Sequence, residues 1–546
     1  MTSLKIITVT LCTSLLTCAL VHGQEKTAAA NSATADSAAA VFQPNLQSLQ
    51  QYECPDWFRD AKFGIWANWG PQCVPEQGDW YARHMYESSL HPSNKHAVKQ
   101  AKAGKQAKSA KATAPHRLYV YHVENYGHPS KVGYKDIIPM FKAENWDPDQ
   151  LMELYKKAGA KYFVATACHH DNFDLWNSKH HRWNSVAMGP KRDIVGEWQK
   201  AAQKQGLKFG VSEHLGASWG WFGVNKDSDP TGDMQGVPYD GNDPQYADLY
   251  YTGNAGIKRT KETWYSPQTP DSFKQTWLDR ISDLIDNYHP DLLYSDGSLP
   301  FGDYGRRMLA HYYNDNLQQH GGKLEAVYNC KANEDGGEFP AGAVVQDVER
   351  GLLEGIQSEP WQTDTSVADW YHNRNFPYKT TAMVIHMLAD IVSKNGNLLI
   401  NFPQKADGTL TEQSLQILQE LAQWMAVNEE AIFATRPWKI FGEGPSQAVK
   451  SARAHGNEEQ LQYTAADIRF TTKGDTLYAI TLGVPQADVT IQSLGTNSEA
   501  KKVAQVTLLG SSAKIDWKQD GNALVIRSLA QWPCDHAVVF KVEFAE

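Results

Sequence analysis

Amphipathic helical stretches alternate with short apolar runs through the middle of the chain. In the helical stretches apolar residues recur every three or four positions, and each following run is as apolar as a buried strand. Five pairs are visible: 149–158 with 161–167, 193–205 with 208–213, 272–288 with 292–294, 304–320 with 324–328, and 380–393 with 398–402. Such alternation predicts parallel strands covered by helices.

The length of the alternating region favours a closed barrel. It spans about 380 residues, which accommodates a (β/α)8-like barrel with long loops. A doubly wound sheet is the alternative, but no GxGxxG or GxxxxGK[ST] motif follows a strand, so the usual signature of nucleotide binding is missing. After Trp438 the pattern changes to short β-like runs separated by turns such as 473–475 and 520–522. We therefore expect a barrel over 46–438 and a C-terminal antiparallel β-sandwich over 439–546.

The N-terminus has the pattern of an export signal. Lys5 precedes an apolar stretch, 6–21, that is short and interrupted by Ser and Thr. We expect a signal peptide over 1–23, a flexible linker rich in Ala, Ser and Thr over 24–45, and a periplasmic or extracellular protein. Residues 15–18 loosely resemble a lipoprotein box, which makes Cys18 a candidate for lipidation. No other stretch is long and apolar enough to span a membrane.

Composition narrows the function classes. The net charge of −10 argues against general nucleic-acid binding, which needs a basic surface. A Lys/Ala-rich interruption at 95–114 is best explained as a solvated helix or insertion. The 18 tryptophans fill a core and also suit sugar binding, because the apolar face of a sugar ring packs on aromatic rings. We therefore expect an oligosaccharide or polysaccharide as the partner.

Polar and aromatic clusters follow the expected strands. In a barrel the carboxyl ends of all strands meet at one rim, so these clusters would lie together. Asp296 ends the strand 292–294 and is followed by Gly297, which allows a sharp turn. The candidate sugar-binding residues at the same rim are Asn68, Trp69, Asp79, Trp80, His169, His170, Glu213, His214 and Trp361.

The adjacent histidines His169 and His170 raise the question of a metal. Neighbouring residues on an extended strand point to opposite sides, and no HExxH motif or CxxC pair is present. We therefore expect no metal site, and we expect the two imidazoles to bind sugar hydroxyls instead.

Asp296 with a second carboxylate would suffice for glycoside hydrolysis. In the retaining version one carboxylate attacks the anomeric carbon while the other protonates the leaving oxygen, and the two stand about 5–5.5 Å apart. Sequence spacing does not select the second carboxylate, because barrel loops fold across one another. The candidates are Glu213, Glu338, Glu349, Glu354 and Glu359.

Several blocks of this sequence form a recognisable series: 57–64, 127–148, 169–193 with its His-His pair and its Gly-Pro-Lys-Arg-Asp end, and 398–401, 405–408 and 435–438. In this order they resemble the α-L-fucosidases of glycoside hydrolase family twenty-nine. The resemblance covers about Pro55 to Trp438. It implies a retaining exo-glycosidase that needs neither a metal nor an organic cofactor, with Asp296 as nucleophile and Glu349 as acid/base, and with Glu213 and Glu354 as alternatives for the acid/base.

Three departures from the resembled family concern the sugar pocket. The family usually has His-Trp-Gly where this chain has Asn68-Trp69-Gly70, and a tyrosine near Glu213. Asp79-Trp80 stands where Glu-Trp is common. A more polar pocket would accept α-L-galactose, which is α-L-fucose with a hydroxyl on C6. An α-L-galactosidase acting on algal-type polysaccharide is therefore one alternative, and an inactive sugar-binding relative is another.

Overall fold

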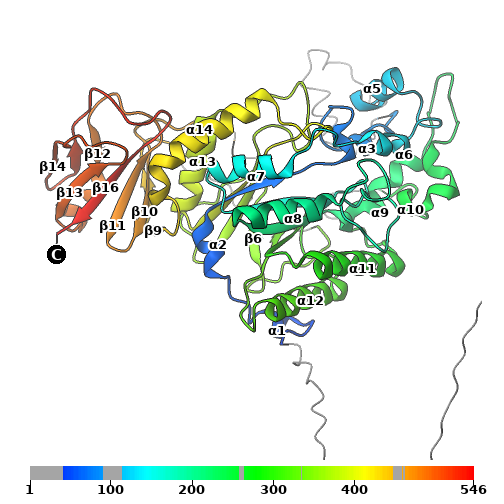
Figure 1. Ribbon diagram of the computed structural model, residues 1–546, viewed down its shortest axis with the longest axis horizontal. Coiled ribbons are helices and arrows are strands. Elements are labelled where there is room, and N and C mark those ends of the chain that lie inside the picture. The colour runs from blue at the N-terminus through cyan, green and yellow to red at the C-terminus, as the bar shows by residue number, and fades with distance from the viewer. Residues whose placement is uncertain are drawn as a thin grey trace, which may run out of the picture. The chain divides into compact units, whose positions relative to one another are not determined.

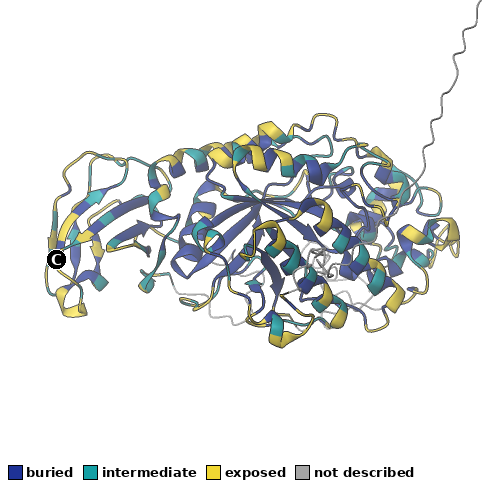
Figure 2. Ribbon diagram, turned by 60° about the horizontal axis from the view of Figure 1, so that its bottom comes forward, coloured by how far each residue is buried: buried dark blue, intermediate teal, exposed yellow. Residues whose placement is uncertain are grey.

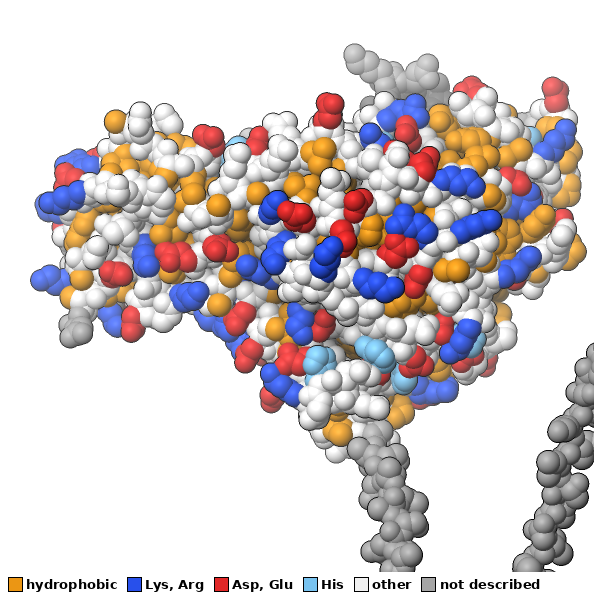
Figure 3. Space-filling view, viewed as in Figure 1, with side chains coloured by type: hydrophobic (Ala, Val, Ile, Leu, Met, Phe, Trp, Pro, Cys, Tyr) orange, Lys and Arg blue, Asp and Glu red, His pale blue; other side chains and the backbone are white. Residues whose placement is uncertain are grey.

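The computed structural model describes residues 41–89, 114–257, 264–333, 335–446, 458 and 462–545. The expected signal peptide lies outside these ranges, as do most of the expected linker and most of the Lys/Ala-rich interruption. Within the described ranges no helix has the length and apolar character needed to cross a bilayer. On the face drawn in Figure 3, Lys and Arg side chains are interspersed with Asp and Glu rather than gathered into one basic area.

Eight parallel strands close into a barrel in chain order, with β8 paired to β1 (Figure 1). This confirms the expected (β/α)8-like barrel over the doubly wound sheet. The strands are β1 (Phe63–Ala67), β2 (Tyr162–Cys168), β3 (Lys208–Glu213), β4 (Leu292–Ser295), β5 (Val327–Lys331), β6 (Val345–Asp347), β7 (Trp361–Ser366) and β8 (Gly396–Asn401).

Four of the six main covering helices, α7, α8, α13 and α14, begin at a side-chain cap. The Asp147 carboxylate accepts from the Gln150 amide at 3.0 Å, and Thr380 and Thr411 cap their helices in the same way. These helices are α7 (Pro148–Lys157), α8 (Ile194–Gln205), α11 (Asp271–Tyr288), α12 (Asp303–Gln319), α13 (Thr381–Ser393) and α14 (Glu412–Asn428). Shorter ones are α1 (Leu46–Leu49), α2 (Asp56–Ala61), α3 (Tyr81–His84), α5 (Arg117–Asn125), α6 (Tyr134–Ile137), α9 (Ser218–Trp221) and α10 (Ala247–Tyr250).

The alternation of strand and helix is interrupted on one side of the barrel. In the described residues that connect β5 to β6, and β6 to β7, no α-helix forms. These connections contain glycines and prolines, such as Gly342 and Pro360, which disfavour helix. The described parts of the two connections are therefore loops.

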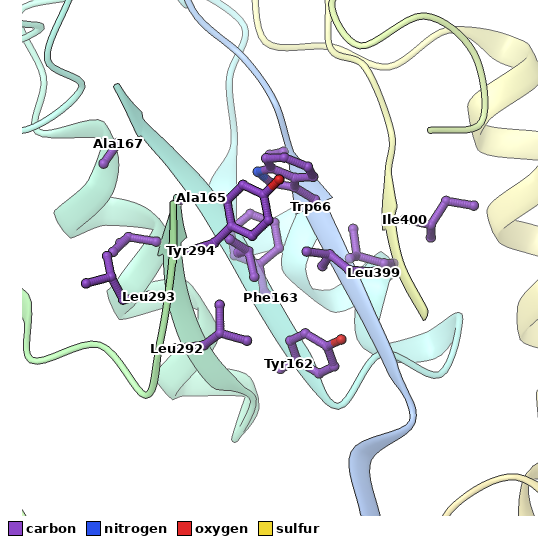
Figure 4. Packing of buried hydrophobic residues seen from close by; sticks show 14 of the residues in the cluster. Trp66, Tyr162, Phe163, Ala165, Ala167, Leu292, Leu293, Tyr294, Leu399 and Ile400 are labelled. Atoms are coloured by element: carbon purple, nitrogen blue, oxygen red, sulfur yellow. The ribbon is translucent and has the colours of Figure 1, made fainter. Parts of the chain in front are cut away.

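Large aromatic side chains fill the barrel interior (Figure 4). Trp66 of β1 and Tyr294 of β4 meet there, with ring centroids 5.3 Å apart. Lower in the barrel, the Tyr162 ring occupies the space beside Gly64, where an added Cβ would come within 2.3 Å of it. Glycine at that position makes room for the ring. In Figure 2 the barrel strands are almost wholly buried, so this interior is a packed core on which the rim rests.

Two antiparallel sheets follow the barrel, and their facing apolar side chains form a second core. The larger sheet has the order β13-β16-β11-β10-β9, and the smaller has the order β12-β15-β14. This confirms the expected C-terminal antiparallel β-structure. The strands are β9 (Arg436–Glu443), β10 (Ile468–Lys473), β11 (Thr476–Thr481), β12 (Val489–Ile491), β13 (Val503–Leu508), β14 (Trp517–Gln519), β15 (Leu524–Ile526) and β16 (Val538–Phe544).

The sandwich is joined to the barrel through apolar and charged contacts. Tyr478, Ile480 and Val539 of the larger sheet belong to the same buried cluster as the barrel core. Beside them, Asp390 of α13 pairs with Arg469 of β10, with 2.6 Å between Oδ1 and Nε. Burial opposes the charge on Asp390, but Lys394 and Arg469 outweigh it and lower the pKa of its carboxyl.

Candidate active site

Asp296 is the first residue after β4, and the backbone around it is held tightly. Its amide donates to the carbonyl of Glu213 in β3 at 3.1 Å, and its carbonyl accepts from the Tyr265 hydroxyl. Gly297 follows with a φ of 91°, and a Cβ there would lie 2.8 Å from both Asp335 and the Tyr265 hydroxyl. A glycine is therefore required for the turn that presents the carboxylate at the carboxyl rim.

Lys331, the last residue of β5, joins Asp296 to Glu349. Its ammonium nitrogen lies 2.5 Å from Asp296 Oδ1 and 2.7 Å from Glu349 Oε2. Because both oxygens contact one nitrogen, they are at most about 5.2 Å apart, which is too close for the roughly 6.5–9.5 Å of inverting glycosidases and is compatible with the retaining arrangement. Of the five glutamates considered from sequence, Glu349 is the one with this contact.

The charge on Asp296 is stabilised by its neighbours. Burial raises the pKa of its carboxyl, but the Lys331 ammonium, together with the neighbouring His170 and His214 rings, outweighs burial and holds the pKa well below the usual value. Nε2 of His170 lies 3.3 Å from Asp296 Oδ2, and Nδ1 of His214 lies 3.5 Å from the same oxygen. Asp296 is therefore ionised at neutral pH, as a nucleophile must be.

Asp79 contributes a carboxyl of the opposite character. Burial raises its pKa well above the usual value, and the charge of Asp369 adds to the effect. Its Oδ1 accepts from the Trp80 amide at 2.8 Å and lies 3.8 Å from His169 Nε2. A carboxyl that keeps its proton can donate a hydrogen bond to a ligand oxygen, which Asp296 cannot do.

Aromatic rings form a wall and a floor around these groups. The Trp80 ring lies 5.7 Å from Trp264 and 6.1 Å from Trp221, and the His170 ring lies 5.0 Å from Trp264. Below, His214 lies 5.8 Å from Tyr294 of the barrel interior. Such a wall offers an apolar surface to the face of a sugar ring, beside hydrogen-bonding groups for its hydroxyls.

Two of the expected sugar-binding residues are engaged elsewhere. The Glu213 carboxylate points toward α11, where it accepts from Ser295 Oγ at 2.5 Å, from the Leu215 amide at 2.9 Å and from Trp277 Nε1 at 3.2 Å. Trp361 is the first residue of β7, so it lies at the opposite end of the barrel from the rim, and its indole donates to the Lys394 carbonyl at 3.0 Å. The expectation that Trp361 follows a strand end at the rim is wrong, because β7 begins at this residue.

Asn68 and Trp69 lie just beyond β1 and are buried. The Asn68 amide oxygen accepts from Thr166 Oγ1 at 3.0 Å. The Trp69 ring packs 4.9 Å from Phe141, and its indole nitrogen donates to the Lys405 carbonyl at 2.8 Å. Both residues support the rim from within the barrel wall.

The other glutamates have different surroundings. Glu338 pairs with Arg306 at 2.6 Å, while Glu354 and Glu359 are exposed. None of these three contacts Lys331 in the described part of the chain. Glu349 therefore remains the glutamate that the geometry brings to Asp296.

Sequence reasoning missed Lys331 and the residues that enclose it. The expected strand 324–328 ends before Lys331, whereas β5 runs from Val327 to Lys331, so the lysine sits at a strand end after all. Tyr265 and Trp264 come from a loop whose path no local pattern reveals. One sequence signal could have found Lys331. It comes shortly after the apolar run 324–328, just as Asp296 comes shortly after the apolar run 292–294.

The fold and the paired carboxylates at its rim define this chain as a glycoside hydrolase of the barrel type. A family model described as "Alpha-L-fucosidase" matches residues 28–430, and a second, described as "Alpha-L-fucosidase C-terminal domain", matches residues 460–543. The chain therefore belongs to the α-L-fucosidase family, and the resemblance drawn from sequence is confirmed.

Individual relatives match along most of their length. The chain is 28% identical to the "Tissue alpha-L-fucosidase" of Mus musculus, with 92% of this chain and 93% of that protein covered. It is 27% identical to the "Alpha-L-fucosidase" of Branchiostoma floridae, with 92% and 96% covered. Among solved structures, the Thermotoga maritima alpha-fucosidase in complex with a mechanism-based inhibitor aligns with a TM-score of 0.66 and 26% identity, covering 92% of this chain and 99% of that chain.

Proposed function

We propose that this enzyme hydrolyses terminal α-L-fucosides of glycans by double displacement, with net retention at the anomeric carbon. The observation that carries the retaining mechanism is the contact of one ammonium group with both Asp296 and Glu349. This shared contact keeps the two carboxyl groups close together and supports a mechanism in which one of them attacks the sugar directly. Family membership supports the choice of fucose.

In the first step a carboxylate oxygen of Asp296 attacks the anomeric carbon, while Glu349 gives a proton to the leaving oxygen. The glycosidic bond breaks and a glycosyl ester forms. In the second step Glu349 takes a proton from water, which attacks the same carbon and releases Asp296. Asp296 loses its charge in the first step as Glu349 gains one. Lys331 contacts both groups, so it has an anionic partner in each state.

The structure weighs on the choice between fucoside and galactoside. The galactosidase alternative rests on two polar replacements, Asn68 and Glu213. The Glu213 carboxylate faces α11, and the Asn68 amide oxygen is bonded to Thr166. These contacts favour the fucoside. A comparison of kcat/KM on matched aryl α-L-fucoside and α-L-galactoside tests the choice, and a preference for the galactoside would overturn it.

Substitution at the nucleophile tests the mechanism. Asp296→Asn should fold normally and lower kcat by about 10³-fold or more, because an amide does not form the glycosyl ester. The matched control is Asp291→Asn at the other end of the same strand, where the carboxylate pairs with Lys208 at 2.7 Å, far from the rim. The Asp291→Asn variant should retain kcat.

NMR of the first product should show the α anomer. Near-normal turnover by Asp296→Asn, or a β anomer, would refute the proposal, and sugar binding without turnover in the wild type would support a sugar-binding relative.

We also propose that the protein is exported by its first 23 residues to the periplasm or the extracellular space. The supporting observation is Lys5 followed by the interrupted apolar stretch 6–21. Mass spectrometry of the mature N-terminus tests this proposal. Cleavage near Gly23 is expected, a lipid-modified Cys18 would place the protein on a membrane surface, and an intact Met1 would contradict export.

A further inference from the structure

Three histidines gather beside the nucleophile. His169, His170 and His214 are buried and offer ligand atoms that lie within 4.8 Å of one another. The sequence argument against a shared ion assumed that His169 and His170 lie on an extended strand. In the structure β2 ends at Cys168, so both residues lie beyond it, and their ring centroids are 4.4 Å apart. The two rings therefore occupy the same pocket.

The hydrogen bond of His170 fixes which of its nitrogens carries a proton. Nδ1 lies 2.7 Å from the carbonyl oxygen of His214, and a carbonyl oxygen accepts only, so Nδ1 is the donor. In the neutral ring Nε2 then holds a lone pair. It faces the Asp296 Oδ2 atom at 3.3 Å, and that atom is also an acceptor. A stable contact between these two acceptors requires a positive charge on or between them: a proton or a metal ion.

His214 supplies a second, independent observation. Its side chain is only 6% exposed, and neither ring nitrogen makes a hydrogen bond to the described residues. Its nearest polar approach to the site is the 3.5 Å from Nδ1 to Asp296 Oδ2. Buried polar nitrogens are almost always bonded, so a nitrogen aimed at a carboxylate without a bond indicates a site for a bound species.

The distances fit the coordination of a small tetrahedral ion. Bonds of about 2.0–2.1 Å from zinc to nitrogen and oxygen set neighbouring ligand atoms about 3.3–3.4 Å apart. The two distances that meet at Asp296 Oδ2 are 3.3 and 3.5 Å. We propose that His170 Nε2, His214 Nδ1 and Asp296 Oδ2 form a binding site for a divalent transition-metal ion such as Zn²⁺, with the fourth position open to water.

The groups around this site are compatible with a cation. Lys331 pairs with Oδ1 of Asp296 and leaves Oδ2 to face the histidines, while Glu349 is a second acidic partner of the Lys331 ammonium. His169 lines the site without ligating, because its Nδ1 accepts from the Gln72 amide at 3.0 Å and its Nε2 proton faces Asp79. An ion at this position takes up the lone pair with which Asp296 attacks the sugar. The metal is thus an inhibitor that competes with the substrate. Only this inhibition rests on the proposed function, because the metal site itself is argued from the side-chain geometry.

Metal titration of the full chain, stripped with chelator, tests the site without any assay of activity. Calorimetry with Zn²⁺ should show one ion per chain, and Co²⁺ should give the visible absorption of a tetrahedral centre. His214→Asn should raise the Kd at least about tenfold, as loss of metal-site groups does. His170→Gln should do the same and serves if the first variant does not fold.

The matched control is the other histidine cluster of the described residues, His84, Glu87 and His116. There the His84 and His116 rings are stacked 4.1 Å apart at 20°, so one ion does not lie in both ring planes. His116→Asn should leave the Kd unchanged. Absence of Zn²⁺ binding to the wild type, or binding that survives His214→Asn and disappears in His116→Asn, would overturn the proposal. Zn²⁺ should also raise KM for an aryl fucoside without lowering kcat. If the protein does not turn over the fucoside at all, the proposed function fails, but the calorimetric test of the metal site still holds.

Discussion

The ammonium group of Lys331 determines the charge of the site at the scale of single residues. It contacts Asp296 and Glu349 at 2.5 and 2.7 Å and is itself buried. Burial opposes its charge, yet the two carboxylates raise the pKa of Lys331 well above the usual value. The Lys331 ammonium therefore stays protonated at neutral pH, and its charge keeps Asp296 ionised.

Removing this charge should move the acid limb of the pH profile. Without Lys331 the pKa of Asp296 rises, so in Lys331→Met the activity should be lost at a higher pH as the solution is acidified. We expect the limb of kcat/KM to shift upward by at least about one pH unit, because a unit corresponds to only 1.36 kcal/mol of interaction. Lys208→Met, which removes the partner of Asp291 at the far end of β4, should leave the profile in place. An unchanged limb in Lys331→Met would show that Lys331 does not set the charge of Asp296.

Glu349 should be recognised by its dependence on the leaving group. Glu349→Gln should slow natural glycans far more than activated aryl fucosides, because an activated leaving group needs little protonation. Azide should restore part of the turnover, since it attacks the glycosyl ester without a general base. The exposed Glu354, changed to Gln, should show neither effect. Rescue of Glu354→Gln or Glu213→Gln instead would move the acid/base to that residue.

At the scale of secondary-structure elements, apolar periodicity predicted which segments form helices and strands. It did not predict the features that depend on contacts between distant segments. The helix expected at 272–288 is α11, Asp271–Tyr288, because its apolar spacing and its burial agree. The strand expected at 324–328 is Val327–Lys331, because a buried lysine does not read as part of an apolar run. Asp296 was identified because it directly follows an apolar strand. The sequence did not predict the direction of the Glu213 side chain. That direction depends on which face of β3 packs against α11, where Trp277 donates to the Glu213 carboxylate.

The contact between α13 and β10 allows a prediction of stability. Arg469→Gln removes one of the two cations that bind the buried Asp390 and should lower the free energy of unfolding by about 3 kcal/mol. Arg527→Gln removes an exposed partner of Asp488 in the same sandwich and should cost less than about 1 kcal/mol. Denaturant unfolding of the two variants measures the difference. Equal stabilities would mean that the buried pair adds nothing to the union of barrel and sandwich.

At the scale of the whole molecule, the barrel and the sandwich share one core. Tyr478, Ile480 and Val539 pack into the barrel cluster, and Trp424 of α14 donates to the Ala537 carbonyl at 3.0 Å. Separating the two parts would expose this apolar surface to water. The enzyme should therefore unfold in a single calorimetric transition, with loss of activity at the same temperature. Two resolved transitions, with activity lost in only one of them, would contradict this expectation.

The missing helices between β5, β6 and β7 have a consequence for the evolution of the enzyme. Asp296 is bonded through its backbone to β3, so moving it would change the register of the barrel. Glu349 lies in the loop after β6, next to Arg350. The Arg350 amide donates to the Asp364 carbonyl at 2.8 Å, and the Arg350 guanidinium approaches Glu458. Insertions in such a loop leave strand pairing intact. Insertions here can thus move Glu349 without moving Asp296, and directed evolution of aglycone preference should start in this loop.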